Sequence, residues 1–193
     1  MTTRTEDSLL LLSGGADSAA AAALLQPAMC LFVDYGQNPA RSESRAAKAV
    51  ADELGIPLRS VTIDLSELGS GMLVSGSSLH VAPTEEWFPY RNLYLATMGA
   101  SFALQLGLQR VLLGLVAEDG NRNVDGSRAF LESLSSLISM QEGGISVHAP
   151  LSNETAATVV KECGLSRATL QRTHSCHEKG SCSQQGMLRG FSV

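Results

Sequence analysis

The residues of this chain that point most clearly to chemistry form one short segment, Ser13-Gly14-Gly15-Ala16-Asp17-Ser18. The segment follows an apolar run, Ser8 to Leu12, and precedes an alanine-rich helical pattern. Adjacent glycines let the backbone turn sharply and approach an oxyanion, while hydroxyls and the N–H groups of a helix start donate hydrogen bonds to it. A plain turn with a helix cap is the alternative, but the complete hexapeptide between a strand and a helix favours a cradle for phosphate or pyrophosphate.

Three further polar side chains stand where they would line such a site. Asp34 and Tyr35 follow the apolar run Met29 to Val33, and ligands of parallel sheets bind at the carboxyl ends of the strands. Capping of the next turn is the other role open to Asp34. The guanidinium of Arg91 matches a phosphate or a carboxylate with two parallel hydrogen bonds, and a structural ion pair is its alternative role.

The elements that position these residues follow from hydrophobic period and from glycine and proline. Short apolar runs predict strands at Ser8–Leu12, Met29–Val33, Leu58–Ile63 and Val111–Leu115. Helical spacing predicts helices at Asp17–Leu25, Ala40–Leu54, Leu93–Gln109, Ser127–Met140 and Asn153–Cys163. This alternation is typical of βα units around a parallel sheet. The segment Ser66–Thr84 is rich in glycine and serine and lacks periodicity, so it predicts a long loop or lid.

Composition favours one globular domain. Of the 193 residues, 44% are hydrophobic and 17% charged, which excludes a disordered or fibrous chain. A net charge of −5 leaves no global basic field for a nucleic-acid backbone, so we expect a small ligand or a protein partner and no nucleic acid. The first residues lack a signal-peptide pattern and Leu93–Gln109 carries a polar stripe, so we expect a cytoplasmic protein outside the membrane.

The hexapeptide resembles the Ser-Gly-Gly-x-Asp-Ser loop of the PP-loop ATP pyrophosphatases, enzymes that adenylate a substrate and release pyrophosphate. Further landmarks stand in the same order as in QueC, the 7-cyano-7-deazaguanine synthase family. These landmarks are Val33–Gln37, Leu54-Gly55, Pro89–Leu93, Gly114 with Asp119 and Asp125, and Ser175-Cys176. The resemblance extends from Leu10 to Phe191, and the order and spacing of the short motifs make the combination specific.

This resemblance implies a doubly wound, mostly parallel α/β sheet of the HUP and Rossmann-like type, as a single domain over residues 1–193 with a short cysteine-containing tail. It implies that ATP and Mg²⁺ bind at the loop after the first strand. The carboxylate of 7-carboxy-7-deazaguanine would then displace pyrophosphate, and ammonia would convert the acyl adenylate to an amide and, after a second adenylation, to a nitrile. Such catalysis depends on charge stabilisation and alignment more than on a protein nucleophile.

The family also implies roles for individual residues. ATP binding falls on Leu12, Ser13, Gly14, Gly15, Ala16, Asp17, Ser18, Asp34 and Tyr35. Catalytic contacts fall on Ser13, Asp17, Ser18 and Arg91, and substrate contacts on Arg91, Asn92, Asp119 and Asp125. The two last carboxylates would accept hydrogen bonds from a guanine-like edge, and solvated loop acids are the equally weighted alternative. A homodimer is implied by the resemblance alone.

The chain departs from the family in its tail and in one loop. The chain has four cysteines, Cys30, Cys163, Cys176 and Cys182, and only the last two correspond to the four-cysteine zinc site of QueC. Lys179 and Gln185 stand where thiolates are expected. His174 or His177 would have to complete a tetrahedral site, so we expect little zinc and free thiols. The stretch Pro150–Glu154 is short and lacks the lysine that the family carries near the nucleotide.

These departures leave the amine acceptor open between ammonia and a protein amine. The second acceptor would fit QueC-like proteins of bacterial anti-phage systems of the CBASS type. From another class, a catalytically weak nucleotide-binding module retained for assembly would keep the loop but not the reaction. Pyrophosphate release discriminates this module from an enzyme.

Overall fold

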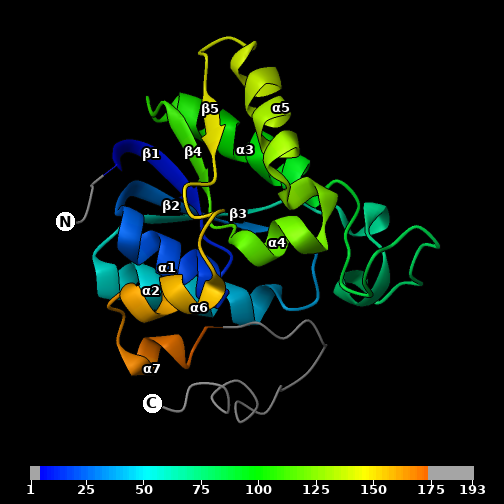
Figure 1. Ribbon diagram of the computed structural model, residues 1–193, viewed down its shortest axis with the longest axis horizontal. Helices are drawn as coiled ribbons and strands as arrows, with labels where there is room; N and C mark the ends of the chain where they lie inside the picture. Colours follow the sequence, from blue (N-terminus) through cyan, green and yellow to red (C-terminus); the bar gives the residue numbers. More distant parts are fainter. Residues whose placement is uncertain (1–4, 174–193) are drawn as a thin grey trace.

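The architecture is given by a computed structural model, which describes residues 5–173. Five strands form one sheet: β1 Thr5–Leu11, β2 Pro27–Asp34, β3 Leu58–Thr62, β4 Arg110–Leu113 and β5 Ser146–His148. Every neighbouring pair is parallel, and the spatial order is β3-β2-β1-β4-β5 (Figure 1). The chain therefore builds outward from β1 to β3 and then returns to the other side of β1. This order puts the topological switch point between β1 and β4, where ligands of such sheets bind.

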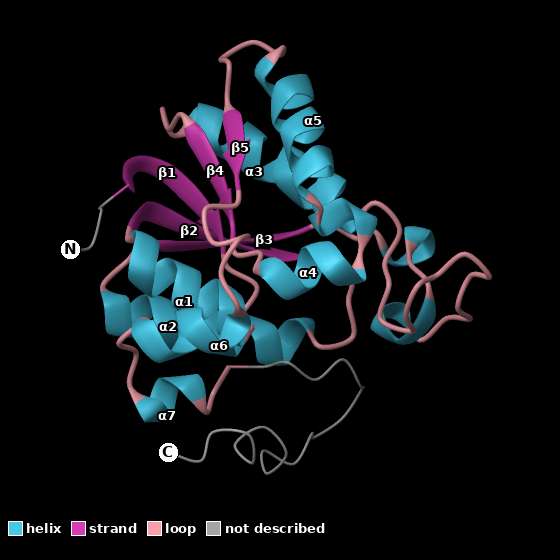
Figure 2. Cartoon of the chain, viewed as in Figure 1, coloured by secondary structure: helices cyan, strands magenta, loops and turns pink. Residues whose placement is uncertain are grey.

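Helices cover both faces of the sheet (Figure 2). One face carries α1 Ala16–Leu25, α2 Ala40–Leu54, α6 Ala156–Glu162 and α7 Arg167–Leu170. The other carries α3 Arg91–Gln105 and α5 Arg128–Ser139, while α4 Ala117–Arg122 follows β4. Short 3₁₀ turns lie at Ser66–Leu68, Gly71–Val74 and Val124–Gly126. The described residues thus form the doubly wound α/β fold that the sequence predicts.

Strand β1 shows why two cores form around one sheet. Leu9 and Leu10 are both fully buried, but they point to opposite faces because successive side chains of a strand alternate. Leu10 packs in the core with the alanines of α1, whereas Leu9 packs in the core under α3 and α5. The small side chains Ala19–Ala22 are fully buried, so α1 lies close against the sheet and brings its first turn to the end of β1.

The predicted elements differ from the observed ones mainly at short segments. The helix at Ala40–Leu54 has the predicted bounds, and Gly55 ends it in a left-handed conformation. Helix α3 starts two residues before the predicted Leu93, so Arg91 and Asn92 belong to its first turn. Strand β5 and helices α4 and α7 were not predicted, because three to six residues carry too little periodicity. Among residues 5–173, none of the helices is long and apolar enough to span a membrane.

The segment predicted as a long loop or lid is anchored at the start of α2. The side chain of Asn38 donates to the carbonyl oxygen of Met72 at 2.6 Å and to Ser75 Oγ at 2.9 Å. Gly71 has a φ of 64°, and a Cβ there would overlap the carbonyl oxygen of Glu85. An open cavity of about 470 Å³ lies between these residues and Ser78. The part of the segment around residues 71–75 therefore packs against the residues that precede α2.

Candidate functional site

The loop from Ser13 to Gly15 joins β1 to α1 at the switch point of the sheet. Its hydroxyls form hydrogen bonds within the loop: Ser13 Oγ lies 2.9 Å from Ser18 Oγ, and Ser18 Oγ donates to the carbonyl oxygen of Gly15 at 3.0 Å. The N–H of Gly15 donates to Ser13 Oγ at 3.3 Å. Within the described chain, no side chain caps the start of α1. The N–H groups of its first turn therefore face outward for an anion, as a phosphate cradle requires.

Two glycines let three backbone segments meet at this loop. Gly14 has a φ of 84°, and a Cβ there would overlap the carbonyl oxygen of Glu43 in α2. Gly114, just after β4, lies so close to α1 that a Cβ would stand 2.7 Å from the Cα of Ser18. Both positions need glycine for close backbone approach, and the resulting bare backbone is what a phosphate group contacts. The loop thus has the open backbone that the predicted phosphate or pyrophosphate cradle requires.

One side of the loop is acidic. Burial raises the pKa of Asp17, and the negative charges of Asp119 and Glu118 raise it further, while Arg122 acts in the opposite direction. Asp119 Oδ2 accepts a hydrogen bond from the N–H of Val116 at 2.9 Å, which orders the start of α4. Glu118 accepts from the N–H of Ala156 at 3.1 Å. These carboxylates repel one another, so a cation or a ligand rich in N–H groups would stabilise them.

The opposite side combines Asp34, Tyr35, Gln37, Glu43 and Arg91. Burial raises the pKa of Glu43 to about 7, although the hydrogen bond from Gln37 and the charge of Arg91 lower it, and Asp34 raises it slightly further. Burial likewise raises the pKa of Tyr35 to about 12 against the charge of Arg91. The Tyr35 ring stands edge-on to another aromatic ring, that of Phe88, with 5.1 Å between centroids. Arg91 from α3 is therefore brought to the groups that follow β2.

The start of α3 is tied to the segment after α4. The buried side chain of Asn92 donates to the carbonyl oxygen of Asp125 at 3.0 Å. Tyr90, immediately before α3, has a φ of 55°, a conformation unusual for an aromatic residue. Through Nδ2, Asn92 thus binds the backbone of the protein, and the substrate contact implied for Asn92 stays a prediction. The bond joins Asn92 to the main-chain carbonyl of Asp125 and not to the Asp125 carboxylate.

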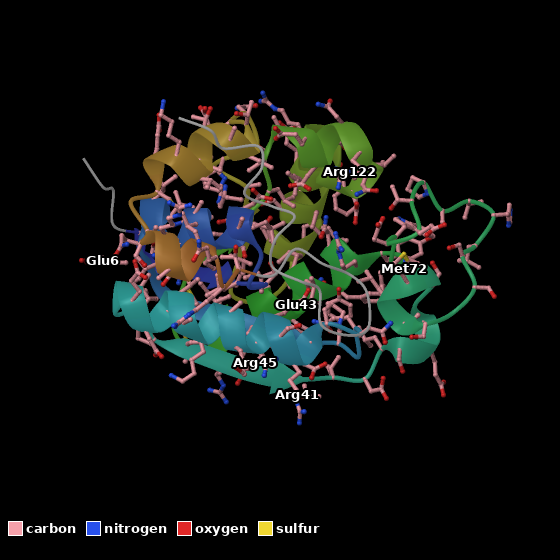
Figure 3. The ribbon with its side chains drawn as sticks, turned by 90° about the horizontal axis from the view of Figure 1, so that it is seen from below. Glu6, Arg41, Glu43, Arg45, Met72 and Arg122 are labelled. Atoms are coloured by element: carbon pink, nitrogen blue, oxygen red, sulfur yellow. The ribbon has the colours of Figure 1, made fainter. Side chains whose placement is uncertain are left out.

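Sequence reasoning missed Glu43 and the role of Gln37, and it missed Glu118. Glu43 stands three and four residues before the buried Ala46 and Ala47, which puts this carboxylate on the apolar stripe of α2. Arg41 and Arg45 of the same helix are exposed and point away from Glu43 (Figure 3). An acidic residue on an otherwise apolar stripe is the signal that would have identified it.

Cys176 and Cys182, which correspond to an incomplete zinc site, lie outside the described residues, as do His174 and His177. Within residues 5–173, Cys30 and Cys163 are buried free cysteines, and burial raises the pKa of the Cys30 thiol to about 12. The same residues contain no group of three or more His, Cys, Asp or Glu side chains that could hold a metal ion by themselves. A metal at the loop would therefore depend on ligand atoms from a bound phosphate.

Comparison with known proteins matches residues 7–187 to the family model of the queuosine biosynthesis protein QueC. The chain belongs to the QueC family. This QueC-family chain is 27% identical over 159 residues to 7-cyano-7-deazaguanine synthase 1 of Desulfitobacterium hafniense strain Y51, which covers 78% of the chain and 71% of the relative. It is 31% identical over 161 residues to the 7-cyano-7-deazaguanine synthase of Acidobacterium capsulatum, covering 74% of the chain and 69% of that relative.

A solved structure supports the fold of the QueC-family chain. The U34-tRNA thiolase NcsA from Methanococcus maripaludis superposes with a TM-score of 0.56 at 16% sequence identity. The superposition covers 96% of this chain and 63% of the thiolase, so the chain spans less than two thirds of that protein. At this identity the likeness concerns the α/β architecture alone. The predicted α/β fold class with a parallel sheet is thereby confirmed.

Proposed function

We propose that this QueC-family protein uses ATP to adenylate the carboxylate of 7-carboxy-7-deazaguanine and then transfers the activated acyl group to an amine. The proposal is carried by one observation: an intact Ser-Gly-Gly-Ala-Asp-Ser loop, Ser13–Ser18, stands at the sheet's switch point in a chain of this family. Relatives named 7-cyano-7-deazaguanine synthase supply the substrate class.

In the proposed reaction, the loop and the first turn of α1 hold the phosphates of ATP. An oxygen of the substrate carboxylate attacks the α-phosphorus, the bond to the β-phosphate oxygen breaks, and pyrophosphate leaves. Arg91 would hold the substrate carboxylate with its guanidinium, and Asp17 would hold Mg²⁺ together with phosphate oxygens. Bound Mg²⁺ supplies neutralisation of the phosphate charge. Asp119 and Asp125 would accept hydrogen bonds from the N–H groups of the guanine-like ring.

The acceptor in the proposed reaction is ammonia, which gives the amide and, after a second adenylation, the nitrile. A protein amine is the second candidate, because the tail departs from the family at Lys179 and Gln185 and the loop 150–154 lacks a lysine. A secondary amide bearing a peptide cannot lose water to form a free nitrile, so that reaction stops after one step. The homodimer, the cytoplasmic location and the low zinc content stay predictions.

Incubation with ATP, Mg²⁺ and 7-carboxy-7-deazaguanine tests the proposal, with pyrophosphate release and product mass as the two measurements. We expect release that depends on the acid, and with ammonia a product of the nitrile's mass. A mass increase on a peptide or partner protein would identify the alternative acceptor. Nucleotide binding without acid-dependent pyrophosphate release would contradict the proposal and favour a nucleotide-binding assembly module.

A further inference from the structure

Glu43 is a carboxylate at the phosphate loop that the proposed function leaves without a role. It lies in the first turn of α2 and is half-buried. Its own carbonyl oxygen occupies the space beside Gly14 that a Cβ would need. Figure 3 shows Glu43 on the inner side of α2, opposite to Arg41 and Arg45. Glu43 is therefore next to the position that the phosphates of ATP would take.

A chain of two hydrogen bonds orients this carboxylate. The side chain of Gln37 is 4% exposed, accepts from the N–H of Tyr35 at 2.8 Å through Oε1, and donates to Glu43 Oε2 at 2.8 Å through Nε2. Since the first bond fixes which end of the amide is the acceptor, the other end must donate. Gln37 thus engages one oxygen of Glu43 and leaves Oε1 without a donor from this amide. A base held by a third group in this way is a common catalytic arrangement.

The charges that face Glu43 come from two elements. Arg91 from α3 acts to lower its pKa, whereas Asp34 at the end of β2 acts to raise it, and the Tyr35 hydroxyl stays neutral because its own pKa is about 12. Because burial is the largest of these effects, the pKa of Glu43 is raised to about 7. Arg91 is the residue that the proposed function assigns to the substrate carboxylate, so a substrate held by Arg91 would place its reacting carboxylate in the region of Glu43.

Amide formation from an acyl adenylate requires a group that accepts a proton. As the nitrogen attacks, the C–N bond forms, the nitrogen becomes positively charged, and the C–O bond to AMP breaks with its electron pair leaving on AMP. The nitrogen must lose one proton, and a base that titrates near the working pH accepts it efficiently. Glu43 lies beside Gly14, and its carboxylate is oriented by the hydrogen bond from Gln37. We therefore consider it for the role of this base.

We propose that Glu43 is the general base that accepts this proton from the attacking amine, an inference that rests on the proposed function. The proton passes from the nitrogen to the free oxygen of Glu43 and then to water, so charge and atoms balance. Adenylation does not need this step, because the attacking group there is already a carboxylate. Glu43 should therefore matter for the second half-reaction and not for the first.

The test compares wild type with Glu43→Gln, which keeps the shape of the side chain and an oxygen for Gln37. Acid-dependent exchange of labelled pyrophosphate into ATP measures adenylation, and amide formation with ammonia measures the second step. We expect Glu43→Gln to lower amide formation by about 100-fold or more and to keep exchange within about threefold of wild type. Hydroxylamine gives a third measurement, because its adduct is acidic enough to lose a proton to water directly. Hydroxamate formation should therefore survive the substitution.

Two further variants sharpen the result. Glu43→Asp keeps the carboxylate but withdraws it by one methylene group, so it should show an intermediate loss with ammonia. Asp52→Asn, an exposed position of the same helix that pairs with Lys48, should leave all three measurements unchanged. In wild type the ammonia reaction, corrected for free ammonia, should rise through about pH 7, and this rise should vanish in Glu43→Gln.

Four outcomes separate the hypotheses. Unchanged amide formation in Glu43→Gln would overturn the inference alone, and so would an equal loss of exchange, amide and hydroxamate, which would mean that Glu43 only shapes the loop. Absence of acid-dependent exchange in wild type would overturn the proposed function and the inference together. Selective loss of the ammonia reaction would establish Glu43 as the base.

Discussion

Acidic residues near the phosphate loop and acidic residues on the protein surface have opposite pKa shifts. The surface residues, Asp7 and Glu53, are called the rim carboxylates below. Burial raises the pKa of Asp17 and of Glu43. On the rim, the hydrogen bonds and charge of Arg110 lower the pKa of Asp7, while hydrogen bonds from Thr169 and Ser166 lower that of Glu53. At the rim carboxylates, hydrogen bonds stabilise the charged form and outweigh burial. At the loop carboxylates, the cost of burying the charge outweighs the hydrogen bonds and opposite charges around it. A site that keeps such groups gives up stability for chemistry.

The contrast has a definite sign in pH. Glu53 has a pKa below its ordinary value of 4.5, so its contribution to stability is present above that value and is lost as pH falls through the lowered pKa. Glu43 has its pKa raised from 4.5 to about 7, so the folded state loses stability as pH rises across that interval. Lowering the pH should thus remove the stabilising contribution of Glu53, whereas it should remove the destabilising contribution of Glu43.

The largest expected effect comes from removing a contact inside the loop. Ser13→Ala and Asp17→Ala should each lower acid-dependent pyrophosphate release by roughly 100-fold, because one preorganised contact to a developing charge is worth about 3 kcal/mol. Circular dichroism should show both variants folded. Ser133→Ala, on the exposed side of α5, is the matched control and should retain full activity. Undiminished release in either loop variant would contradict the assignment of the phosphate loop.

Gly14→Ala tests the close approach of the loop to α2. The added Cβ would overlap the carbonyl oxygen of Glu43 and sit at a φ of 84°. Gly55→Ala has a similar φ of 65° but open space around its Cβ, so it isolates the cost of the backbone conformation. Gly14→Ala should lower the free energy of unfolding by about 2 kcal/mol more than Gly55→Ala and should also lower activity. If urea titrations gave equal losses in the free energy of unfolding for the two variants, helix α2 would be able to move away from the added Cβ without loss of stability.

Glu43→Gln should stabilise the fold while it removes the proposed base. Replacing a buried carboxylate by an amide ends the cost of keeping it charged, which we expect to raise the free energy of unfolding by about 1 to 2 kcal/mol near pH 7.5. The gain should disappear near pH 4.5, where the carboxyl group is largely protonated in the folded state. Thermal unfolding of both proteins at the two pH values measures it. A gain that does not depend on pH would show that the charge of Glu43 is already well compensated.

The smallest effect is expected at Glu53, where the same substitution has the opposite sign. Glu53 accepts hydrogen bonds from the N–H of Ser166 at 2.8 Å, from Ser166 Oγ at 2.9 Å and from Thr169, and so fastens α7 to α2. Glu53→Gln should reduce stability slightly at neutral pH, with the difference shrinking toward acid. Hydrogen exchange of α7 should become faster, while adenylation stays unchanged. Unaltered exchange in α7 would mean that apolar contacts hold this helix.

Local patterns in the sequence were enough to predict much of this molecule. The Gly14-Gly15 turn between an apolar run and a helix predicted the loop after β1, and the periodicity of Ala40–Leu54 predicted α2 with its bounds. Four of the five strands were predicted for the same reason, since period and turn residues act over a few positions. The order of the motifs identified the family that the comparison confirms.

Only the tertiary structure decided which groups share a site and how they titrate. Asp17 meets Asp119 because β1 and β4 are neighbours in the sheet, although they are far apart in the chain. Glu43 reaches the loop because Gly14 admits the backbone of α2, and Gln37 then orients its carboxylate. Burial, which raises the pKa of both carboxylates, depends on how all the elements pack together. Sequence patterns report short-range preferences, whereas proximity and desolvation arise only when the sheet is assembled.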